Sequence, residues 1–214
     1  MIEAIKRIRP AGERLSAFQM IWHTALLLAL GVALGLLAKF LDELPSNELP
    51  FLLERLDLAN FLSGFSFWVL LSVIISVYSR SPLRAGINAF CFLTGMLVGY
   101  YTYTAFISGF FPRSYIMIWV IMTLFSPLLA AVCWLAKGPG VLSMVITSGI
   151  LMVFFLMAFA VGFLYFDIFS MLDVLMWLIC IAVLYQSPKQ IVICIGASSA
   201  AAILISVLRP YLPF

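Results

Sequence analysis

The side chains most able to do chemistry in this sequence are polar groups that lie inside long apolar segments. Such groups are costly to bury in hydrocarbon and usually face the protein interior, where they can bind a solute or relay a proton. Segment 84–110 holds the densest set, which comprises Asn88, Thr94, Gly95, Gly99, Tyr100, Tyr101, Thr102, Tyr103, Thr104 and Ser108. Helical neighbours are separated by about 100°, so the run 100–104 cannot face one way. We predict that the substrate-binding candidates of this segment are Asn88, Thr94, Tyr100 and Tyr103.

A packing role is the alternative interpretation of the same segment. Tyrosines near the end of a span form an interfacial aromatic belt, and threonine hydroxyls bond back to their own helix. Gly95 and Gly99 form a GxxxG pattern, which lets a neighbouring backbone approach closely. The stripe through Asn88, Gly95 and Gly99 is therefore predicted to face the protein interior.

Two titratable residues fall within other apolar segments. Asp173 lies a little under two turns after Asp167, and an intramembrane carboxylate can bind a cation or carry a proton. At a depth of about 9 Å it can also reach interfacial water, and pairing with Arg113 or Arg209 is the alternative. His23 lies near the start of the first apolar segment, where it is either a proton relay or an interfacial, hydrogen-bonded histidine. We keep Asp173 as a substrate-binding candidate.

Catalytic and metal-binding motifs are absent from the sequence. Gly196-Ala197-Ser198-Ser199 is similar to the GxSG motif of rhomboid proteases, but the final glycine is missing and no histidine follows. There is no HExxH, no GxGD aspartate pair and no P-loop. The four cysteines occur singly in apolar stretches, which does not indicate a metal site. We predict no catalytic residues, no metal, no cofactor and no enzymatic activity.

The composition excludes a water-soluble globular fold. The chain is 65% hydrophobic and 10% charged, with a mean hydropathy of +1.18, whereas soluble domains are about 45–50% apolar and about 25% charged. A bilayer accepts apolar side chains on the outside of a protein, so lipid is the predicted solvent. The charges gather at the ends of apolar segments, which excludes a nucleic-acid surface.

These segments predict an all-α, polytopic transmembrane helix bundle. A hydrocarbon core of about 30 Å needs roughly twenty apolar residues per helix. About seven spans meet this length, at residues 18–38, 60–79, 84–110, 114–136, 141–166, 168–186 and 190–208. Only a short turn at 185–190 separates the last two, and the count falls to six or five if they do not both cross. Lys and Arg are more frequent on the side of the N-terminus, which predicts a cytosolic N-terminus and an external C-terminus.

The spans leave one sizeable loop, and we predict a single transmembrane domain over residues 1–214. Residues 1–17 form a basic cytosolic N-terminus, and residues 39–59 form the external loop. Within that loop Leu49, Leu52, Leu53 and Leu56 have helical spacing. This pattern predicts one outer amphipathic helix, either an interfacial connector or a lid over an external cavity. Pro127 is expected to kink the fourth span.

Small residues at four-residue spacing predict helix-packing faces in three spans. The helix-packing candidates are Ala25, Ala29, Ala33, Gly95, Gly99 and Gly196. The alanine row of the first span is similar to that of the substrate-binding S-components of energy-coupling-factor vitamin transporters. That resemblance implies that the alanines meet a coupling subunit. Those proteins normally have six helices with both ends cytosolic, so seven spans depart from their pattern.

The leading functional hypothesis is a small-solute transporter or a substrate-binding membrane subunit, with a pocket facing outward between the third and sixth spans. The alternative is a non-catalytic accessory or scaffold subunit of a larger membrane complex. An intramembrane enzyme is the third and weakest hypothesis. The predicted partners are the lipid bilayer, a small-molecule solute, and a partner membrane subunit or a second copy of the chain. The predicted location is the cell membrane, as a multi-pass protein of a bacterial inner membrane.

Overall fold

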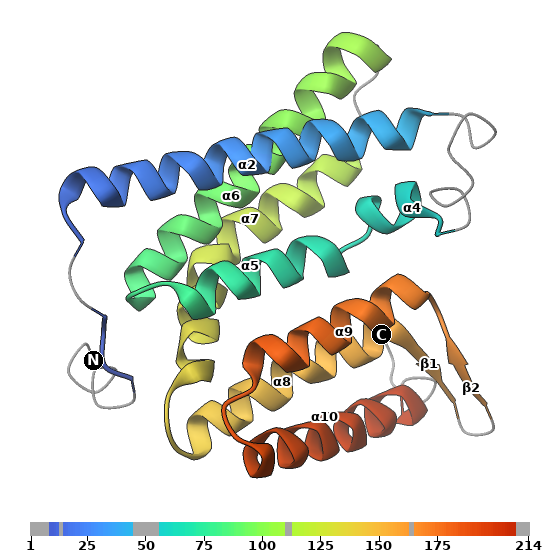
Figure 1. The fold of residues 1–214 in the computed structure, drawn as a ribbon. Helices are drawn as coiled ribbons and strands as arrows, with labels where there is room; N and C mark the ends of the chain where they lie inside the picture. Colours follow the sequence, from blue (N-terminus) through green and yellow to red (C-terminus); the bar gives the residue numbers. More distant parts are fainter. Residues whose placement is uncertain (1–8, 13–14, 45–55, 110–112, 163–164, 209–214) are drawn as a thin grey trace. The chain divides into compact units, whose positions relative to one another are not determined.

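The fold is nearly all helical, as the sequence predicts. The computed structural model describes residues 9–12, 15–44, 56–109, 113–162 and 165–208, and it is 83% helical. Within these residues five helices are long and apolar enough to cross a membrane (Figure 1), with the bounds Ala17–Glu43, Pro82–Ile107, Ile116–Lys137, Val141–Ala158 and Pro188–Leu208. The class of an all-helical membrane bundle follows from these five helices.

Two further apolar helices are too short to cross a bilayer unaided. They are α5 (Ser66–Tyr78, 13 residues) and α9 (Met171–Leu184, 14 residues). At 1.5 Å per residue each is about 20 Å long, whereas the hydrocarbon core is about 30 Å thick. Each of the seven predicted apolar segments contains a helix, but the count of seven spans and the orientation stay predictions.

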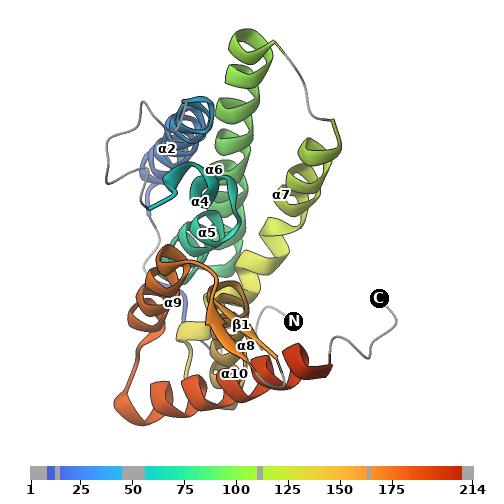
Figure 2. The same cartoon turned by 90° about the vertical axis from the view of Figure 1, so that its right-hand side faces the viewer.

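The chain divides into two compact units, and the first comprises Pro10–Trp134. It contains α2 (Ala17–Glu43), α4 (Leu58–Ser63), α5, α6 (Pro82–Tyr103), a π-helical turn η2 (Thr104–Ser108) and α7 (Arg113–Trp134). The central helix is α6, which contacts α2, α5 and α7 (Figure 2). The prediction of one domain over the whole chain stays a prediction.

Four glycines bring α2 and α6 into direct backbone contact. Gly31 and Gly35 of α2 face the carbonyls of Phe92 and Met96 on α6, while Gly95 and Gly99 of α6 face those of Leu28 and Val32 on α2. A Cβ at any of the four positions would lie 2.1–2.3 Å from one of these oxygens. Both helices therefore carry a GxxxG face, and the two faces pack against each other.

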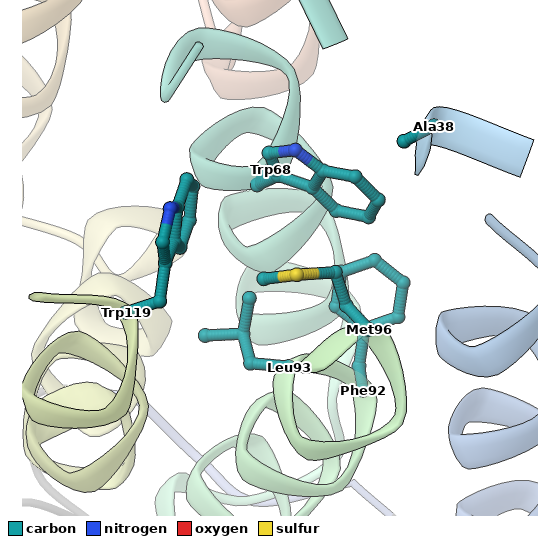
Figure 3. Close-up of a cluster of buried hydrophobic side chains, with 6 residues drawn as sticks. All are labelled: Ala38, Trp68, Phe92, Leu93, Met96 and Trp119. Atoms are coloured by element: carbon teal, nitrogen blue, oxygen red, sulfur yellow. The ribbon is translucent and has the colours of Figure 1, made fainter. Parts of the chain in front are cut away.

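A cluster of buried apolar side chains, several of them aromatic, lies where α6 meets α2, α5 and α7. Figure 3 shows Trp68 beside Phe92 and Met96, with Trp119 of α7 at the edge of the group. The Trp68 indole Nε1 donates to the carbonyl of Leu62 at 2.7 Å, which satisfies its polar atom. Phe65 stacks on Trp119 with ring centroids 4.6 Å apart. These contacts hold α5 and α7 against α6.

The second unit comprises Leu135–Phe214 together with Met1–Arg9. Its elements are η3 (Leu135–Lys137), α8 (Val141–Ala158), β1 (Phe159–Val161), β2 (Phe166–Ile168), α9 and α10 (Pro188–Leu208). Helix α8 packs against α9 and α10. The carbonyl of Ala136 accepts hydrogen bonds from Ser143 Oγ, Thr147 Oγ1 and Gln186 Nε2. Buried polar groups thus tie the start of α8 to the turn before α10.

A β-hairpin replaces the end of the predicted span 141–166, so that boundary is wrong. Helix α8 ends at Ala158, and β1 and β2 pair antiparallel with Phe159 opposite Ile168 (Figure 1). The Phe159 ring stacks on Phe166 at 5.3 Å and meets the edge of Trp177 at 5.5 Å. Aromatic cross-strand pairs favour strands, which explains why an apolar run alone was a poor guide here.

The first helix also runs further than the sequence predicts. Helix α2 continues to Glu43, whereas the loop was expected to start at residue 39. Lys39 pairs with Asp42 at 2.9 Å and with Glu43 at 3.3 Å, and such i,i+3 and i,i+4 pairs stabilise a helix. Residues 45–55, which hold most of the predicted amphipathic helix, lie outside the described residues. Pro127 lies within α7, and its carbonyl would be 3.0 Å from a Cβ on Gly86 of α6.

Candidate functional site

The predicted substrate-binding residues fall into two different units. Asn88, Thr94, Tyr100 and Tyr103 lie on α6, whereas Asp173 lies on α9. The four candidates on α6 are spread from its first turns to its last. A single outward pocket that unites them with Asp173 therefore stays a prediction.

Tyr100 lies in a tight ionic cluster at the end of α2. Its hydroxyl donates to Asp42 Oδ2 at 3.3 Å, and the Lys39 ammonium lies 5.6 Å from the centre of its ring. The Lys39 residue is only 6% exposed, so its two carboxylate partners supply the compensating charge. The space beside Tyr100 measures about 10 Å³, which is room for roughly one water. Tyr100 is therefore closely packed here, and its role in substrate binding stays a prediction.

Tyr103 and Thr94 are two further binding candidates on α6. Tyr103 is half-buried at the last turn of α6. The Thr94 hydroxyl is buried and, among the described residues, has no hydrogen-bond partner. A buried hydroxyl normally finds a partner, so Thr94 is an energetically costly position in the middle of α6.

Asp173 has a local structural role at the start of α9. Ser170 caps this helix by accepting a hydrogen bond from the amide of Leu172 at 3.2 Å, and Asp173 lies in the first turn. A carboxylate there interacts favourably with the partial positive charge of the helix N-terminus. Arg209 and the side chain of Arg113, its alternative partners, lie outside the described part of the chain.

Asn88 belongs to a network that joins α2, α5 and α6. Arg84 Nη2 lies 3.0 Å from Asn88 Oδ1, 2.7 Å from Thr24 Oγ1 and 2.9 Å from the carbonyl of Met20. Asn88 Nδ2 in turn donates to Ser79 Oγ at 3.3 Å. The guanidinium is thus held in place by neutral oxygens from two helices.

A cavity of about 490 Å³ opens beside this network. Its lining residues come from the start of α2, the end of α5 and the start of α6, and they are Leu15, His23, Leu26, Leu27, Ile75, Tyr78, Ser79, Arg80, Arg84 and Asn88. One part of the wall is aliphatic, and the other carries hydroxyl, amide, imidazole and guanidinium groups. Ligand pockets have volumes of about 300–1,000 Å³ and combine an apolar lining with a few polar groups.

The polar wall of this cavity is basic. Arg80, Arg84 and His23 line it, and none of the lining residues that the structure describes is acidic. Within the described residues, no salt bridge joins Arg84 to a carboxylate. The arrangement can therefore bind an anion or a strongly polar solute.

The sequence predicted Asn88 as a binding residue and drew attention to His23, whereas its Lys and Arg residues, Arg80 and Arg84 among them, served only to predict the orientation. The available signal was the i,i+4 spacing of Arg84 and Asn88, which places both on one face of a helix. That spacing does not show which neighbouring helix covers the face.

The helix-packing candidates also separate into two groups. Gly95 and Gly99 lie in the α2–α6 contact. Ala25, Ala29 and Ala33 are exposed on α2, and Gly196 is exposed on α10, where a Cβ added to it would meet no atom of the described chain within 4 Å. Gly31 and Gly35, on another face of the first span, supply the contact that α2 makes with α6.

The described helices expose large apolar side chains over most of their length. On α7, for example, Leu124 is 64% exposed, Phe125 60% and Leu128 65%. Together with the five long apolar helices, these faces define the class as a helical integral membrane protein. No family model, no curated protein and no solved structure matches the chain.

Proposed function

We propose that this chain binds a small solute in the cavity between α2, α5 and α6, as a small transporter or as the substrate-binding membrane subunit of one. The observation that carries the proposal is the cavity of about 490 Å³ with its convergent polar groups. Polar and ionisable side chains are expensive near hydrocarbon and are retained there mainly for function.

The proposed orientation has the N-terminus in the cytosol. Arg80 and Arg84 line the cavity together with residues at the start of α2, so they lie at the end of α2 that is nearest to the N-terminus. Basic residues in short loops favour the cytosolic side. The cavity would then open towards the cytosol, in a multi-pass protein of a bacterial inner membrane. This differs from the external pocket that the tyrosines of α6 favoured.

Filling the cavity tests the proposal. Leu26 lines the cavity and is 50% exposed, so Leu26→Trp should occupy space there without disturbing the core. The matched control is Leu30→Trp, at a position of α2 that is 45% exposed and does not line the cavity. Full-length protein in proteoliposomes would be screened for uptake or binding of sugars, amino acids, carboxylates and phosphate esters.

We expect Leu26→Trp to reduce the uptake or binding of at least one solute class and Leu30→Trp to leave it unchanged. Equal behaviour of both variants and the parent protein across the whole panel would remove the basis for a solute-binding cavity.

The exposed alanines of α2 favour a second candidate, an accessory subunit that packs against a larger membrane partner. Ala25, Ala29 and Ala33 form a row of small, exposed residues, which suits close helix contact. Purification in mild detergent would retain a stoichiometric partner, and Ala29→Leu would release it. Gly99→Leu is a poor test, because Gly99 packs inside the chain. A lone, stable monomer with or without Ala29→Leu counts against this candidate.

A further inference from the structure

Arg84 is a half-buried cation whose charge no described residue neutralises. Its three close acceptors are a carbonyl, a hydroxyl and an amide oxygen, at 2.9, 2.7 and 3.0 Å. These neutral groups orient the guanidinium but leave its net charge in place. A partly desolvated charge is costly without a counter-charge, so an anionic ligand would stabilise this site.

The geometry of Arg84 leaves some of its N–H donors open. All three contacts are made by Nη2, and Nε and Nη1 make no hydrogen bond to any described residue. Each two-donor edge of a guanidinium includes Nη2, so Nε and Nη1 each offer a single charge-assisted hydrogen bond to an oxygen of an anion. Since Thr24 and Asn88 already hold the group, little further ordering is needed on binding.

The surrounding charge favours phosphate over a single carboxylate. Arg80 and His23 also line the cavity, and none of its described lining residues is acidic. A phosphate group carries up to two negative charges and three or more acceptor oxygens, which two arginines and a histidine can share.

The remaining wall of the cavity is apolar. Leu15, Leu26, Leu27 and Ile75 line it, beside the basic groups. An inorganic ion would leave this surface in contact with water. A ligand with an apolar part would cover it, and this would favour binding by about 25 cal/mol for each Å² of apolar surface removed from water.

We infer that the cavity binds the phosphate group of an amphiphilic compound, with Arg84 and Arg80 on the phosphate and the leucine wall on the apolar part. This inference rests on the proposed function, because it names the ligand class of the same cavity. Both an anionic phospholipid and a soluble phosphate ester have this chemistry.

The test uses the full-length protein in nanodiscs of phosphatidylcholine, titrated with inorganic phosphate and with glycerol 3-phosphate by calorimetry. The variants are Arg84→Gln, Arg80→Gln and Arg84→Lys, and the control is Lys189→Gln, which makes the same charge change at an exposed position outside the cavity. Native mass spectrometry after reconstitution with phosphatidylglycerol measures whether an anionic lipid is retained.

Binding should weaken about tenfold or more in Arg84→Gln, as expected for a lost charge-assisted hydrogen bond of about 1.5–3 kcal/mol. Arg84→Lys should lie between this variant and the parent, and Lys189→Gln should bind like the parent. Retention of phosphatidylglycerol that depends on Arg84 would identify a lipid ligand. Arg84-dependent binding of glycerol 3-phosphate without lipid retention would identify a soluble ester. If Arg84→Gln does not fold, the exposed Arg80→Gln variant decides.

Two results would overturn the inference. One is phosphate binding that is equal in the parent, Arg80→Gln and Arg84→Gln proteins. The other is a folded parent protein that binds neither phosphate probe and retains no phosphatidylglycerol. If Leu26→Trp still blocks uptake of an uncharged solute in that case, the solute-binding function stands and only the ligand class fails. If Leu26→Trp has no effect either, both proposals fail.

Discussion

The contact between α2 and α6 makes a specific prediction about single methyl groups. A Cβ added at Gly31 would lie 2.1 Å from the Phe92 carbonyl oxygen, and one at Gly95 would lie 2.2 Å from that of Leu28. Ordinary contact begins at 3.4 Å, so each substitution requires the helices to separate locally by roughly 1 Å. The obstructing atoms are backbone oxygens, which cannot rotate away as a side chain can.

The expected magnitude follows from two opposing effects. Overpacking costs about 1–3 kcal/mol and sometimes more, while alanine favours a helix over glycine by up to about 1 kcal/mol. After the helix gain is subtracted from the overpacking cost, we expect Gly31→Ala and Gly95→Ala each to lower the free energy of unfolding by about 1–2 kcal/mol. Once one methyl has separated the helices, the second meets less resistance, so the double variant should lose less than the sum of the two.

The assay is reversible unfolding of the full-length protein in mixed micelles, followed by tryptophan fluorescence and far-ultraviolet circular dichroism. Gly149→Ala in α8 and Gly196→Ala in α10 are matched controls, since a Cβ at either position meets no described atom within 4 Å. They should be neutral or slightly stabilising. If Gly31→Ala and Gly95→Ala unfold like these controls, the close packing of the two GxxxG faces is refuted.

Three further variants test other contacts by the same unfolding assay. Trp134→Phe removes the 2.7 Å hydrogen bond from the indole to the buried Ser79 carbonyl and should cost about 1–3 kcal/mol, so unchanged stability would contradict that bond. Lys39→Met removes the ammonium group that pairs with Asp42 and Glu43. Because the two carboxylates are 30% and 28% exposed, we expect the free energy of unfolding to fall by only about 1 kcal/mol. A gain in stability would argue against the pairing. Asp173→Asn should cost about 0.5 kcal/mol through the helix dipole and leave solute uptake intact. A selective loss of uptake would instead restore the predicted role of this carboxylate in binding.

The amino-acid sequence determined the class of this protein. Hydropathy is a sum over neighbouring residues in the chain. Long apolar segments, and the charged residues that end them, can therefore be recognised without any knowledge of packing. The GxxxG pattern of Gly95 and Gly99 was visible for the same reason, as was the polar face that includes Asn88. One error appeared at Phe159, where pairing across a hairpin decides the local structure. The other appeared at Lys39, whose pairs with Asp42 and Glu43 are local to α2 and whose charges were mistaken for the end of the helix.

Only the tertiary structure decided what the charged residues do. In the sequence Arg80 and Arg84 carry a positive charge that marks one side of a membrane, and nothing in their order shows which atoms surround them. The crossing of α2 and α6 on their glycine faces brings Met20 and Thr24 to Arg84, and the end of α5 closes the cavity beside them. A binding site depends on distances between residues far apart in the chain, and these distances are set by how helices rotate and cross, which local composition does not encode.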